Sequence, residues 1–394
     1  MTGVAERSDV MSPISAGVVT GLVGFTSSFV IVLAGLTAVG ASPDQASSGL
    51  LAVSITMGLS SIFLSAWTRT PITVAWSTPG AALLASTGMV EGGWPAAVGA
   101  FFVAGVFIVV LTGLVPALGA LIARIPASVA QAMLAGVLLQ LCLGPITGLA
   151  VNPLEVAPVV GVWLLAMRFA PRRSSPLAFV AAATVIGGHV AASGEGRDPG
   201  ALVPRVVITA PEFTLAGIVG IAVPLYLVTM ASQNVPGVAV MKGLGYTVPW
   251  RRSMLVTGAG TLVGASAGGY TINLAAITAA LAAGSEAGED RSRRWVASVT
   301  SGVVVVVLGI GASAFGALVL LAPAGVIAAV AGLALLGTLA SALQAALADP
   351  EERLPAVVVF ATAASGIAVA GVGAAFWALM AGLVVRFALG LSRR

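Results

Sequence analysis

The sequence predicts an all-α polytopic membrane protein of fourteen transmembrane segments, arranged as two inverted repeats of seven. Hydrophobic residues make up 58% of the 394-residue chain and charged residues only 8%, whereas soluble domains carry roughly 25% charged residues. Apolar runs near 20 residues recur from Ile14 to Leu391, and a helix of that length crosses a ~30 Å hydrocarbon core. The 49 glycines favour close packing of helices in lipid.

The first half is predicted to contribute seven segments and the second half seven more. They span 14–38, 46–66, 71–90, 94–121, 127–147, 154–170 and 176–192, then 214–236, 246–266, 270–284, 294–314, 316–341, 353–371 and 373–391. With the N-terminus in the cytoplasm, all Lys and Arg residues except Arg197 and Arg205 fall on the cytoplasmic side. This positive-inside bias supports the count and predicts that both termini are cytoplasmic.

The two halves, 14–192 and 214–391, align at an offset of 199 residues. Because seven is odd, the second half enters the membrane from the opposite side, which gives the inverted-topology repeat of many secondary transporters. The alternative is a chance match between evenly spaced apolar segments, since the halves agree in hydropathy and in their broken segments rather than in residue identity.

Segments 3 and 10 are too interrupted to be ordinary membrane helices. In segment 3 the sequence predicts extended backbone at 71–75 and a half-helix that begins near Ser77 to Pro79. In segment 10 it predicts extended backbone at 270–274 and a half-helix that begins near Ala275. Extended backbone at membrane depth is tolerated where it is paired or lines a cavity, so the two stretches could pair with each other.

Such an arrangement would bring two helix N-termini together near the middle of the membrane. Free N–H groups and partial positive charge at helix N-termini bind anions without a basic side chain. Trp76 and Tyr270 would supply flat apolar walls. The alternative interpretation is that both segments are re-entrant kinks that serve packing alone.

Further polar candidates lie in segments 1, 8 and 10, at Ser27, at Gln233 and Asn234, and at Asn273. Carboxamides inside an apolar helix usually face a cavity or a neighbouring helix. All acidic residues fall in loops or at segment ends, and the one histidine, His189, lies near the outer end of segment 7. We therefore expect a polar, neutral site that favours an anion or a neutral polar solute over a cation.

The residue types of most enzymes are missing from the apolar segments. There is one cysteine, Cys142, no cluster of histidines and no acid at membrane depth. This composition excludes an internal disulfide and a thiolate metal cluster and argues against an intramembrane enzyme. We expect neither a cofactor nor a bound metal. The net charge of +4 is spread over short loops, so nucleic-acid binding is not expected either.

Three stretches carry a resemblance to a known family. They are Pro-Ile-Thr-Val-Ala-Trp-Ser-Thr-Pro-Gly-Ala-Ala-Leu-Leu at 71–84, Thr-Ser-Ser at 26–28 and Thr-Ile-Asn-Leu-Ala-Ala-Ile-Thr-Ala-Ala-Leu at 271–281. Through them the chain resembles the benzoate:proton symporter (BenE) family of bacterial inner-membrane proteins over nearly its whole length. It is more distantly similar to the uracil/xanthine permeases and the sulfate-type anion transporters.

The resemblance implies a core domain from 14–121 and 214–314 and a gate domain from 127–192 and 316–391, with substrate between segments 1, 3, 8 and 10. It implies proton-coupled uptake of benzoate or a similar aromatic carboxylate by movement of the core against the gate. The residues do not show where the proton travels, and His189 and the substrate itself are the candidates. Relatives are often homodimers through the gate domain. The candidate substrate-binding residues are Phe25, Ser27, Trp76, Ser77, Thr78, Gln233, Asn234, Tyr270, Asn273, Ala275 and Ala276.

One departure from the distant relatives leaves alternatives open. The nucleobase permeases carry a glutamate in segment 8 and another in segment 10, where this chain has Gln233-Asn234 and Ile272-Asn273. Recognition of a base through paired carboxylates is therefore not expected. A transporter of the same fold for another anion or for a nucleobase, and an anion channel, are the alternative functions.

Overall fold

The computed structural model describes residues 2–114, 126–193, 205–367, 369 and 374–391. The first half contains α1 (Thr2–Thr26), α2 (Phe29–Ala38), α3 (Pro43–Thr68), β1 (Val74–Trp76), α4 (Thr78–Thr87), α5 (Gly93–Phe107), the π-helical turn η1 (Ile108–Leu114), α7 (Ala127–Cys142), α8 (Gly144–Val151), α9 (Pro153–Phe169), the 3-10 turn η2 (Pro171–Arg173) and α10 (Ser174–Ser193).

The second half follows the same order of long helix, strand and half-helix. It contains α11 (Leu215–Gly217), the π-helical turn η4 (Ile218–Ala222), α12 (Val223–Thr229), the π-helical turn η5 (Met230–Asn234), α13 (Val235–Gly243), α14 (Trp250–Ala265), β2 (Ile272–Leu274), α15 (Ile277–Ala283), the 3-10 turn η6 (Ser285–Ala287), α16 (Trp295–Ile310), α17 (Ala312–Leu320), α18 (Val326–Ala346), α19 (Arg353–Ala364) and α20 (Ala374–Ala388).

Among the described residues, seven helices are long and apolar enough to cross a membrane, or eight if the bent pair α16 and α17 is one span. Other predicted segments correspond to shorter helices, such as α9, α14, α19 and α20, or to the two broken segments. The protein is thus a multi-pass helical membrane protein, and the exact count of fourteen crossings remains a prediction.

Two segments that the sequence predicted as single helices are each divided into two helices in the structure. Segment 12, predicted as one helix over 316–341, is divided: α17 ends at Leu320, bent by 55° from α16, and α18 begins at Val326. Pro323 and Gly325, whose φ is +85°, separate the two helices, because proline lacks an N–H and glycine accepts a positive φ. Segment 1 is interrupted at Ser27 and Ser28, between α1 and α2. The predicted end of segment 4, residues 115–121, lies outside the described residues.

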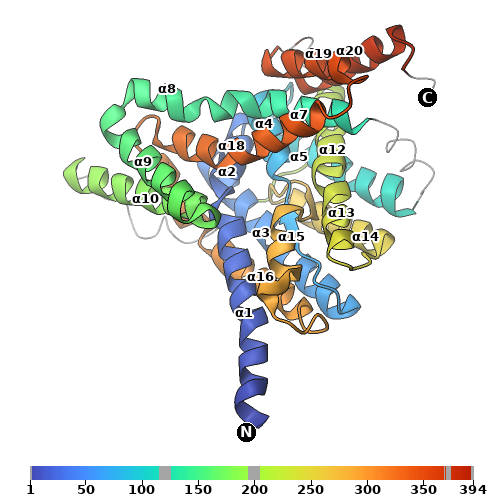
Figure 1. Ribbon diagram of the computed structural model, residues 1–394. Helices are drawn as coiled ribbons and strands as arrows, with labels where there is room; N and C mark the ends of the chain where they lie inside the picture. Colours follow the sequence, from blue (N-terminus) through green and yellow to red (C-terminus); the bar gives the residue numbers. More distant parts are fainter. Residues whose placement is uncertain (1, 115–125, 194–204, 368, 370–373, 392–394) are drawn as a thin grey trace.

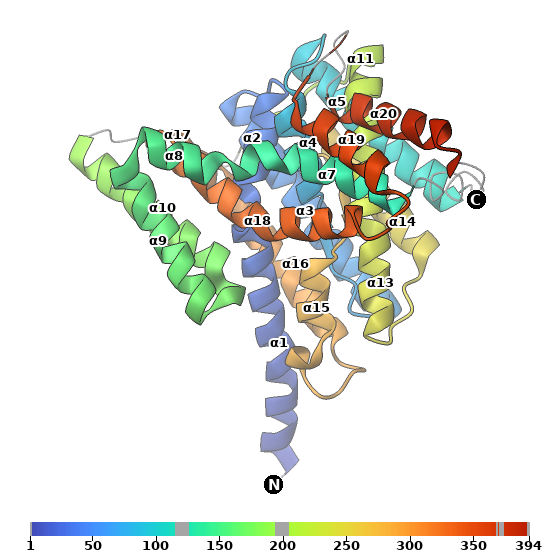
Figure 2. The same ribbon diagram turned by 45° about the horizontal axis from the view of Figure 1, so that its top comes forward.

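The helices pack into two groups (Figures 1 and 2). In one group α3 packs against α14 and α16, and α1 packs along α16. In the other group α7 packs against α18 and α19, α8 against α18, and α19 against α20. Helices α9 and α10 form a pair at one side of the second group.

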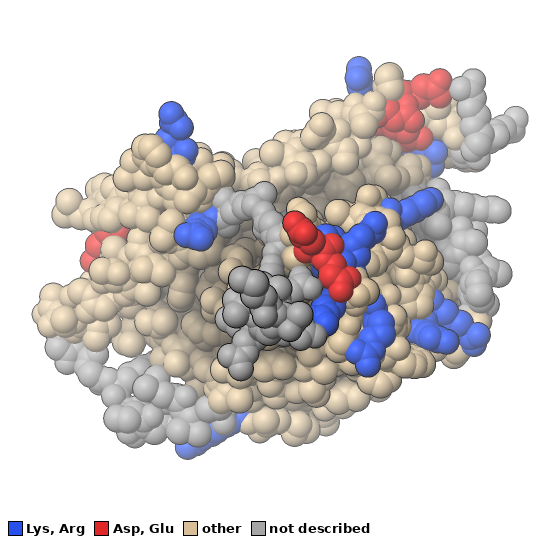
Figure 3. All heavy atoms as spheres, turned by 60° about the horizontal axis from the view of Figure 1, so that its bottom comes forward, with Lys and Arg blue, Asp and Glu red and all other residues tan. Residues whose placement is uncertain are grey.

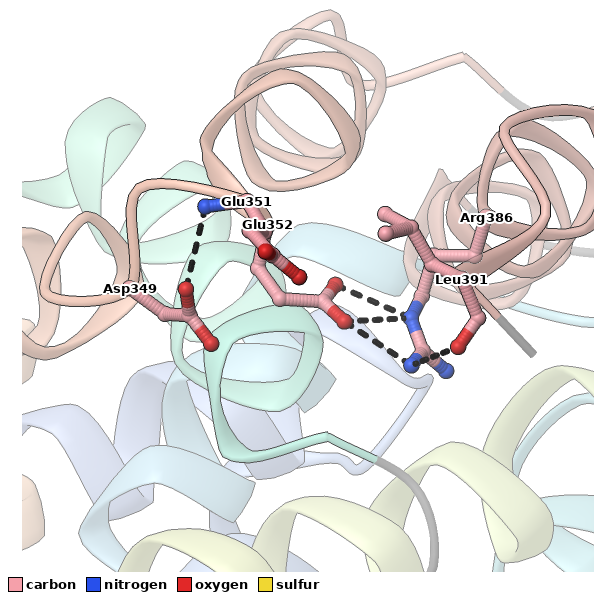
Figure 4. A network of polar contacts seen from close by, with 5 residues as sticks. All are labelled: Asp349, Glu351, Glu352, Arg386 and Leu391. Atoms are coloured by element: carbon pink, nitrogen blue, oxygen red, sulfur yellow. Dashed lines mark hydrogen bonds and ion pairs between the residues drawn. The ribbon is translucent and has the colours of Figure 1, made fainter. Parts of the chain in front are cut away.

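The second group has an ion pair where α19 and α20 meet (Figure 4). Arg386 on α20 donates from Nε to both carboxylate oxygens of Glu352 at 2.9 Å, and its Nη2 lies 2.8 Å from Glu352 Oε1. The two side chains are only 15% and 11% exposed. Asp349 accepts the backbone N–H of Glu351 in the turn before α19. This bidentate pair fixes the turn before α19 to the end of α20.

Strands β1 and β2 come from the two broken segments and pair antiparallel with each other. Val74 lies opposite Leu274, Ala75 opposite Asn273 and Trp76 opposite Ile272. The ladder extends one step at each end, because Ser77 N–H donates to Thr271 O at 3.0 Å and Ala275 N–H to Thr73 O at 2.9 Å. The two halves of the chain therefore satisfy each other's extended backbone.

The outer edge of β1 is covered by hydroxyl groups of α3. Ser61 Oγ accepts the N–H of Val74 at 2.8 Å and donates to the carbonyl of the same residue at 3.2 Å. One turn on, Ser65 Oγ donates to Ile72 O at 2.8 Å. These side chains satisfy the backbone N–H and C=O groups of the strand edge, which water would satisfy in a soluble protein.

The outer edge of β2 is covered in the same way by the second half. Ile272 N–H donates to Thr261 Oγ1 of α14 at 3.2 Å, and Leu274 N–H donates to Asn234 Oδ1 of η5 at 2.8 Å. Both acceptor side chains are buried. The polar residues of these apolar helices thus hold the short ladder in place.

Candidate functional site

A cavity of about 220 Å³ lies where the two broken segments meet. Its walls come from α1, β1, the start of α4, η5, the start of α15 and α16 in the first packing group. The second group contributes the junction of α9 and α10 and the middle of α18. None of the lining residues is Asp, Glu, Lys, Arg or His, and ten of them are Ser or Thr. The cavity is therefore uncharged but rich in hydroxyl groups.

Trp76 forms one wall of the cavity and is fixed by its neighbours. Its indole Nε1–H donates to Ser28 Oγ at 2.9 Å, and Thr78 Oγ1 donates to the same oxygen at 3.3 Å. The Phe25 ring packs behind the indole, with centroids 5.3 Å apart, and stacks in turn on Phe29 at 5.7 Å. The break between α1 and α2 thus supplies the hydroxyl that orients the aromatic wall.

The start of α4 has only one backbone donor left for a ligand. Ser77 caps the helix, since its Oγ accepts the Gly80 N–H at 3.1 Å and its own N–H donates to Thr271 O. Pro79 has no N–H. Of the donors that a helix N-terminus leaves unpaired, the Thr78 N–H therefore remains.

The start of α15 has no such cap. Ala276 stands at the N-cap position without a side-chain hydrogen bond to the helix, and Ala275, Ala276 and Thr278 line the cavity. The start of α15, with its unpaired N–H groups, therefore borders the same cavity as Thr78, whose N–H is the one left free at the start of α4. Together the two ends provide partial positive charge in an uncharged cavity.

The π-helical turn η5 directs two neighbouring carboxamides to different places. Gln233 lines the cavity and forms no hydrogen bond with the described part of the chain. Asn234 is fully buried, accepts from Leu274 N–H and donates to Met230 Sδ at 3.2 Å. π-Turns inside α-helices are frequent at functional sites, and here Gln233 is the amide free for a ligand.

The structure divides the predicted site residues into a lining set and a supporting set. Six line the cavity: Ser27, Trp76, Thr78, Gln233, Ala275 and Ala276. Five stand outside the lining: Phe25, Ser77, Asn234, Tyr270 and Asn273. Phe25 supports Trp76, Ser77 caps α4 and Asn234 holds β2, so their contribution in this conformation is to shape the cavity.

Tyr270 and Asn273 are buried behind the strands. The Tyr270 ring, 1% exposed, lies 6.3 Å from that of Phe101, and its hydroxyl has no hydrogen-bond partner among the described residues. Asn273 is fully buried and donates to Leu274 O at 3.0 Å, while its Oδ1 likewise has no partner among the described residues. The predicted aromatic wall is therefore formed by Trp76 without Tyr270.

The sequence analysis missed several lining residues: Thr20, Thr278, Ser301 and, in the second group, Ser175 and Thr338. Thr20, Thr278 and Thr338 are single hydroxyl residues in apolar helices, whereas Ser175 follows Ser174 and Ser301 follows Thr300. Ser and Thr side chains in helices commonly hydrogen bond to a backbone carbonyl of their own helix, so their presence alone does not indicate a binding site. Only their position on a helix face could have identified them as cavity residues. Thr20, Gly24 and Ser27 do share one face of α1 by their spacing of four and three residues.

His189, predicted as a weak candidate for carrying the proton, does not line the cavity. It lies on α10 and pairs through Nδ1 with Glu155 Oε1 of α9 at 2.9 Å. The described residues also contain no group of three or more His, Cys, Asp or Glu residues that could hold a metal ion.

Comparison with known proteins identifies the family. A family profile described as "Benzoate membrane transport protein" matches residues 8–388. The chain belongs to this family. It is 38% identical over 379 residues to "Inner membrane protein YdcO" of Escherichia coli (strain K12), a match that covers 95% of each chain. It is 32% identical over 383 residues to "Benzoate membrane transport protein" of Acinetobacter baylyi (strain ATCC 33305 / BD413 / ADP1), covering 96% of this chain and 95% of the relative.

Solved structures show the same fold at low sequence identity. The transmembrane domain of a cyanobacterium bicarbonate transporter, BicA, superposes with a TM-score of 0.60 at 14% identity, over 98% of this chain and 97% of that one. The murine Solute Carrier 26 family member A9 anion transporter in the inward-facing state gives 0.63 at 14% identity, over 97% and 68%. The chain thus has the fold of these transporters, with its seven-plus-seven repeat. As a member of a transport-protein family it is a membrane transporter and not an enzyme.

Proposed function

We propose that the protein is a secondary active transporter that takes up benzoate or a similar aromatic carboxylate together with a proton across the bacterial inner membrane. The observation that carries the proposal is the uncharged cavity of about 220 Å³ between the Trp76 indole and the starts of α4 and α15. Family membership and the similarity to the benzoate membrane transport protein of Acinetobacter baylyi support an aromatic acid as the substrate.

The chemistry of the cavity fits an aromatic acid at both ends. The carboxylate would accept hydrogen bonds from the Thr78 N–H, the N–H groups at the start of α15 and the Gln233 amide. The ring would lie against the Trp76 indole, which Ser28 and Phe25 hold in place. Because the cavity has no charged residue of its own, the carboxylate would be the only full charge in it.

Movement of the core domain, 14–121 and 214–314, against the gate domain, 127–192 and 316–391, would carry the substrate across. Elements of both proposed domains line the cavity, among them α1, β1 and α15 from the core and α18 from the gate. The fourteen crossings, the cytoplasmic termini and a homodimer through the gate domain belong to the same proposal. Lys and Arg gather on part of the face seen in Figure 3, which is the distribution expected of a cytoplasmic side.

The proton would travel on the substrate rather than on His189. His189 pairs with Glu155 outside the cavity lining, whereas the substrate carboxylate lies inside it. Symport of one carboxylate with one proton is electroneutral, so uptake should respond to a pH gradient and not to membrane voltage.

A transporter of the same fold for another anion is the second candidate, favoured by the similarity in fold to a bicarbonate transporter and an anion transporter. A neutral nucleobase and an anion channel remain as further alternatives. A nucleobase fits less well, because the glutamates of the nucleobase permeases are absent here and Asn234 is engaged with β2.

Reconstitution into proteoliposomes tests the proposal. Labelled benzoate should accumulate when the outside is more acidic than the inside, and the signal should disappear when an ionophore collapses the pH gradient. Bicarbonate, sulfate and uracil, supplied in excess, should not compete. A failure of every aromatic acid to accumulate or compete would exclude the proposed function, and a large conductance without proton movement would identify a channel.

A further inference from the structure

The cavity extends along α1 from the level of Trp76 past the start of α15. Ser28 stands at the level of Trp76 and Thr78, to which it is hydrogen bonded. Lower on the same helix, Gly24 lies beside Thr278, with its Cβ position 3.4 Å from Thr278 Cγ2. Lower again, the Cβ position of Gly21 is 3.0 Å from the backbone oxygen of Ser301. From Ser27 to Thr20 this wall runs about two turns, roughly 10 Å along the helix axis.

The far end of this wall has two buried hydroxyl groups that differ in the hydrogen bonds they can still form. Thr20 is 1% exposed, and its Oγ1 donates to Ala16 O at 2.7 Å, so only its lone pairs face a ligand. Ser301 is 3% exposed, lines the cavity and forms no hydrogen bond with the described residues. Its hydroxyl is free both to donate and to accept.

We propose that the preferred substrate is a ring-hydroxylated aromatic acid, with its hydroxyl meta or para to the carboxylate and bound by Ser301 and Thr20. The inference rests on the proposed function and names the substrate class more narrowly. A phenolic hydroxyl donates to Thr20 Oγ1 and accepts from Ser301 Oγ. Thr20 thereby gains a donor for its lone pairs, and the Ser301 hydroxyl gains an acceptor.

Other ring substituents do not match this pair. A hydrogen or a methyl group leaves the Ser301 hydroxyl desolvated without a partner, which is costly in a buried site. A second carboxylate has no proton to give to Thr20 and would bring another charge into an uncharged cavity. A hydroxyl ortho to the carboxylate lies at the wrong end of the ring and cannot reach Ser301.

The test is a binding panel on the purified full chain in detergent, read by thermal shift and by competition with labelled benzoate. The panel contains benzoate, its 2-, 3- and 4-hydroxy derivatives, 4-methylbenzoate and terephthalate. We expect the 3- or the 4-hydroxy acid to bind about tenfold more tightly than benzoate, and 2-hydroxybenzoate, 4-methylbenzoate and terephthalate to show no such gain.

A pair of matched variants then identifies the group responsible. Ser301→Ala should bring the affinity ratio of hydroxybenzoate to benzoate close to one. Ser298→Ala, one turn away on α16, removes a hydroxyl that does not line the cavity and is hydrogen bonded to the lining residue Thr73; this variant should keep the ratio. If Ser301→Ala does not fold, the wild-type panel alone decides.

Benzoate binding as tightly as the 3- and 4-hydroxy acids would overturn the inference while leaving the proposed function intact. An equal loss of affinity for both compounds in Ser301→Ala would overturn it as well. If no aromatic acid binds at all, the proposed function fails and the inference fails with it.

Discussion

Exchange of Gln233 for glutamate distinguishes an anionic from a neutral substrate. Gln233 lines the cavity and its amide has no partner among the described residues, so Gln233→Glu adds a negative charge at nearly constant size without breaking an internal hydrogen bond. An anion in the same cavity is repelled by this charge, whereas a neutral nucleobase is not.

The size of the effect follows from the proposed hydrogen bond between residue 233 and the carboxylate. At that distance the two charges lie roughly 4 Å apart, and two like charges so placed repel by about 4 kcal/mol at an effective dielectric constant of 20. The affinity for benzoate should therefore fall roughly 1000-fold.

Gln233→Met serves as the matched control, because it removes the amide and adds no charge. It should lose only one hydrogen bond to the carboxylate, about 1 kcal/mol or roughly fivefold in affinity. The assay is competition for labelled benzoate at about pH 8, well above the ordinary pKa of a glutamate side chain near 4.3. Binding of benzoate to Gln233→Glu as tight as to Gln233→Met would refute the view that the carboxylate lies beside Gln233.

Three further changes test the framework around the cavity. Asn234→Ala leaves the buried Leu274 N–H without its acceptor and should lower the free energy of unfolding by about 1–3 kcal/mol. Asn234→Asp keeps an acceptor for this N–H but adds a negative charge, so its affinity for benzoate should fall by more than its loss of thermal stability accounts for. Ser77→Ala removes the cap of α4 and should cost about 1 kcal/mol, seen as a lower melting temperature that excess benzoate partly restores. Glu352→Gln leaves the mostly buried Arg386 without its ion pair and should lower the free energy of unfolding by about 2 kcal/mol. The double variant Glu352→Gln, Arg386→Gln should recover part of this stability. If the relative affinities for a panel of aromatic acids do not change, the ion pair affects stability alone.

The sequence located the two broken segments because the local chemistry is strong there. β-Branched residues followed by Pro79 and Gly80, and a pair of glycines before Tyr270, favour a strand that gives way to a helix. The strands at Val74–Trp76 and Ile272–Leu274 begin three and two residues later than the predicted starts of extended backbone. Their pairing with each other was left open by the sequence and is seen in the structure.

Which polar residues face the cavity was beyond the reach of the sequence. Gln233 and Asn234 are neighbours with similar side chains, and only the π-turn and the position of Leu274 N–H separate a cavity amide from a structural one. Ser298 and Ser301 present the same difficulty, since one pairs with Thr73 and the other faces the cavity. Such distinctions depend on partners far away in the chain.

The hydrogen bonds between β1 and β2 also set an order for biosynthesis. A ribosome completes β1 almost 200 residues before Leu274 exists, so one edge of β1 has no strand to pair with while the intervening helices are inserted. Its other edge is already satisfied, because Ser61 and Ser65 belong to the helix made just before it. The Ser61 and Ser65 hydroxyls thus hydrogen bond β1 on one edge while the second half is still being synthesised. Substitution of these serines should therefore reduce the amount of folded protein, through degradation during synthesis, before it slows transport.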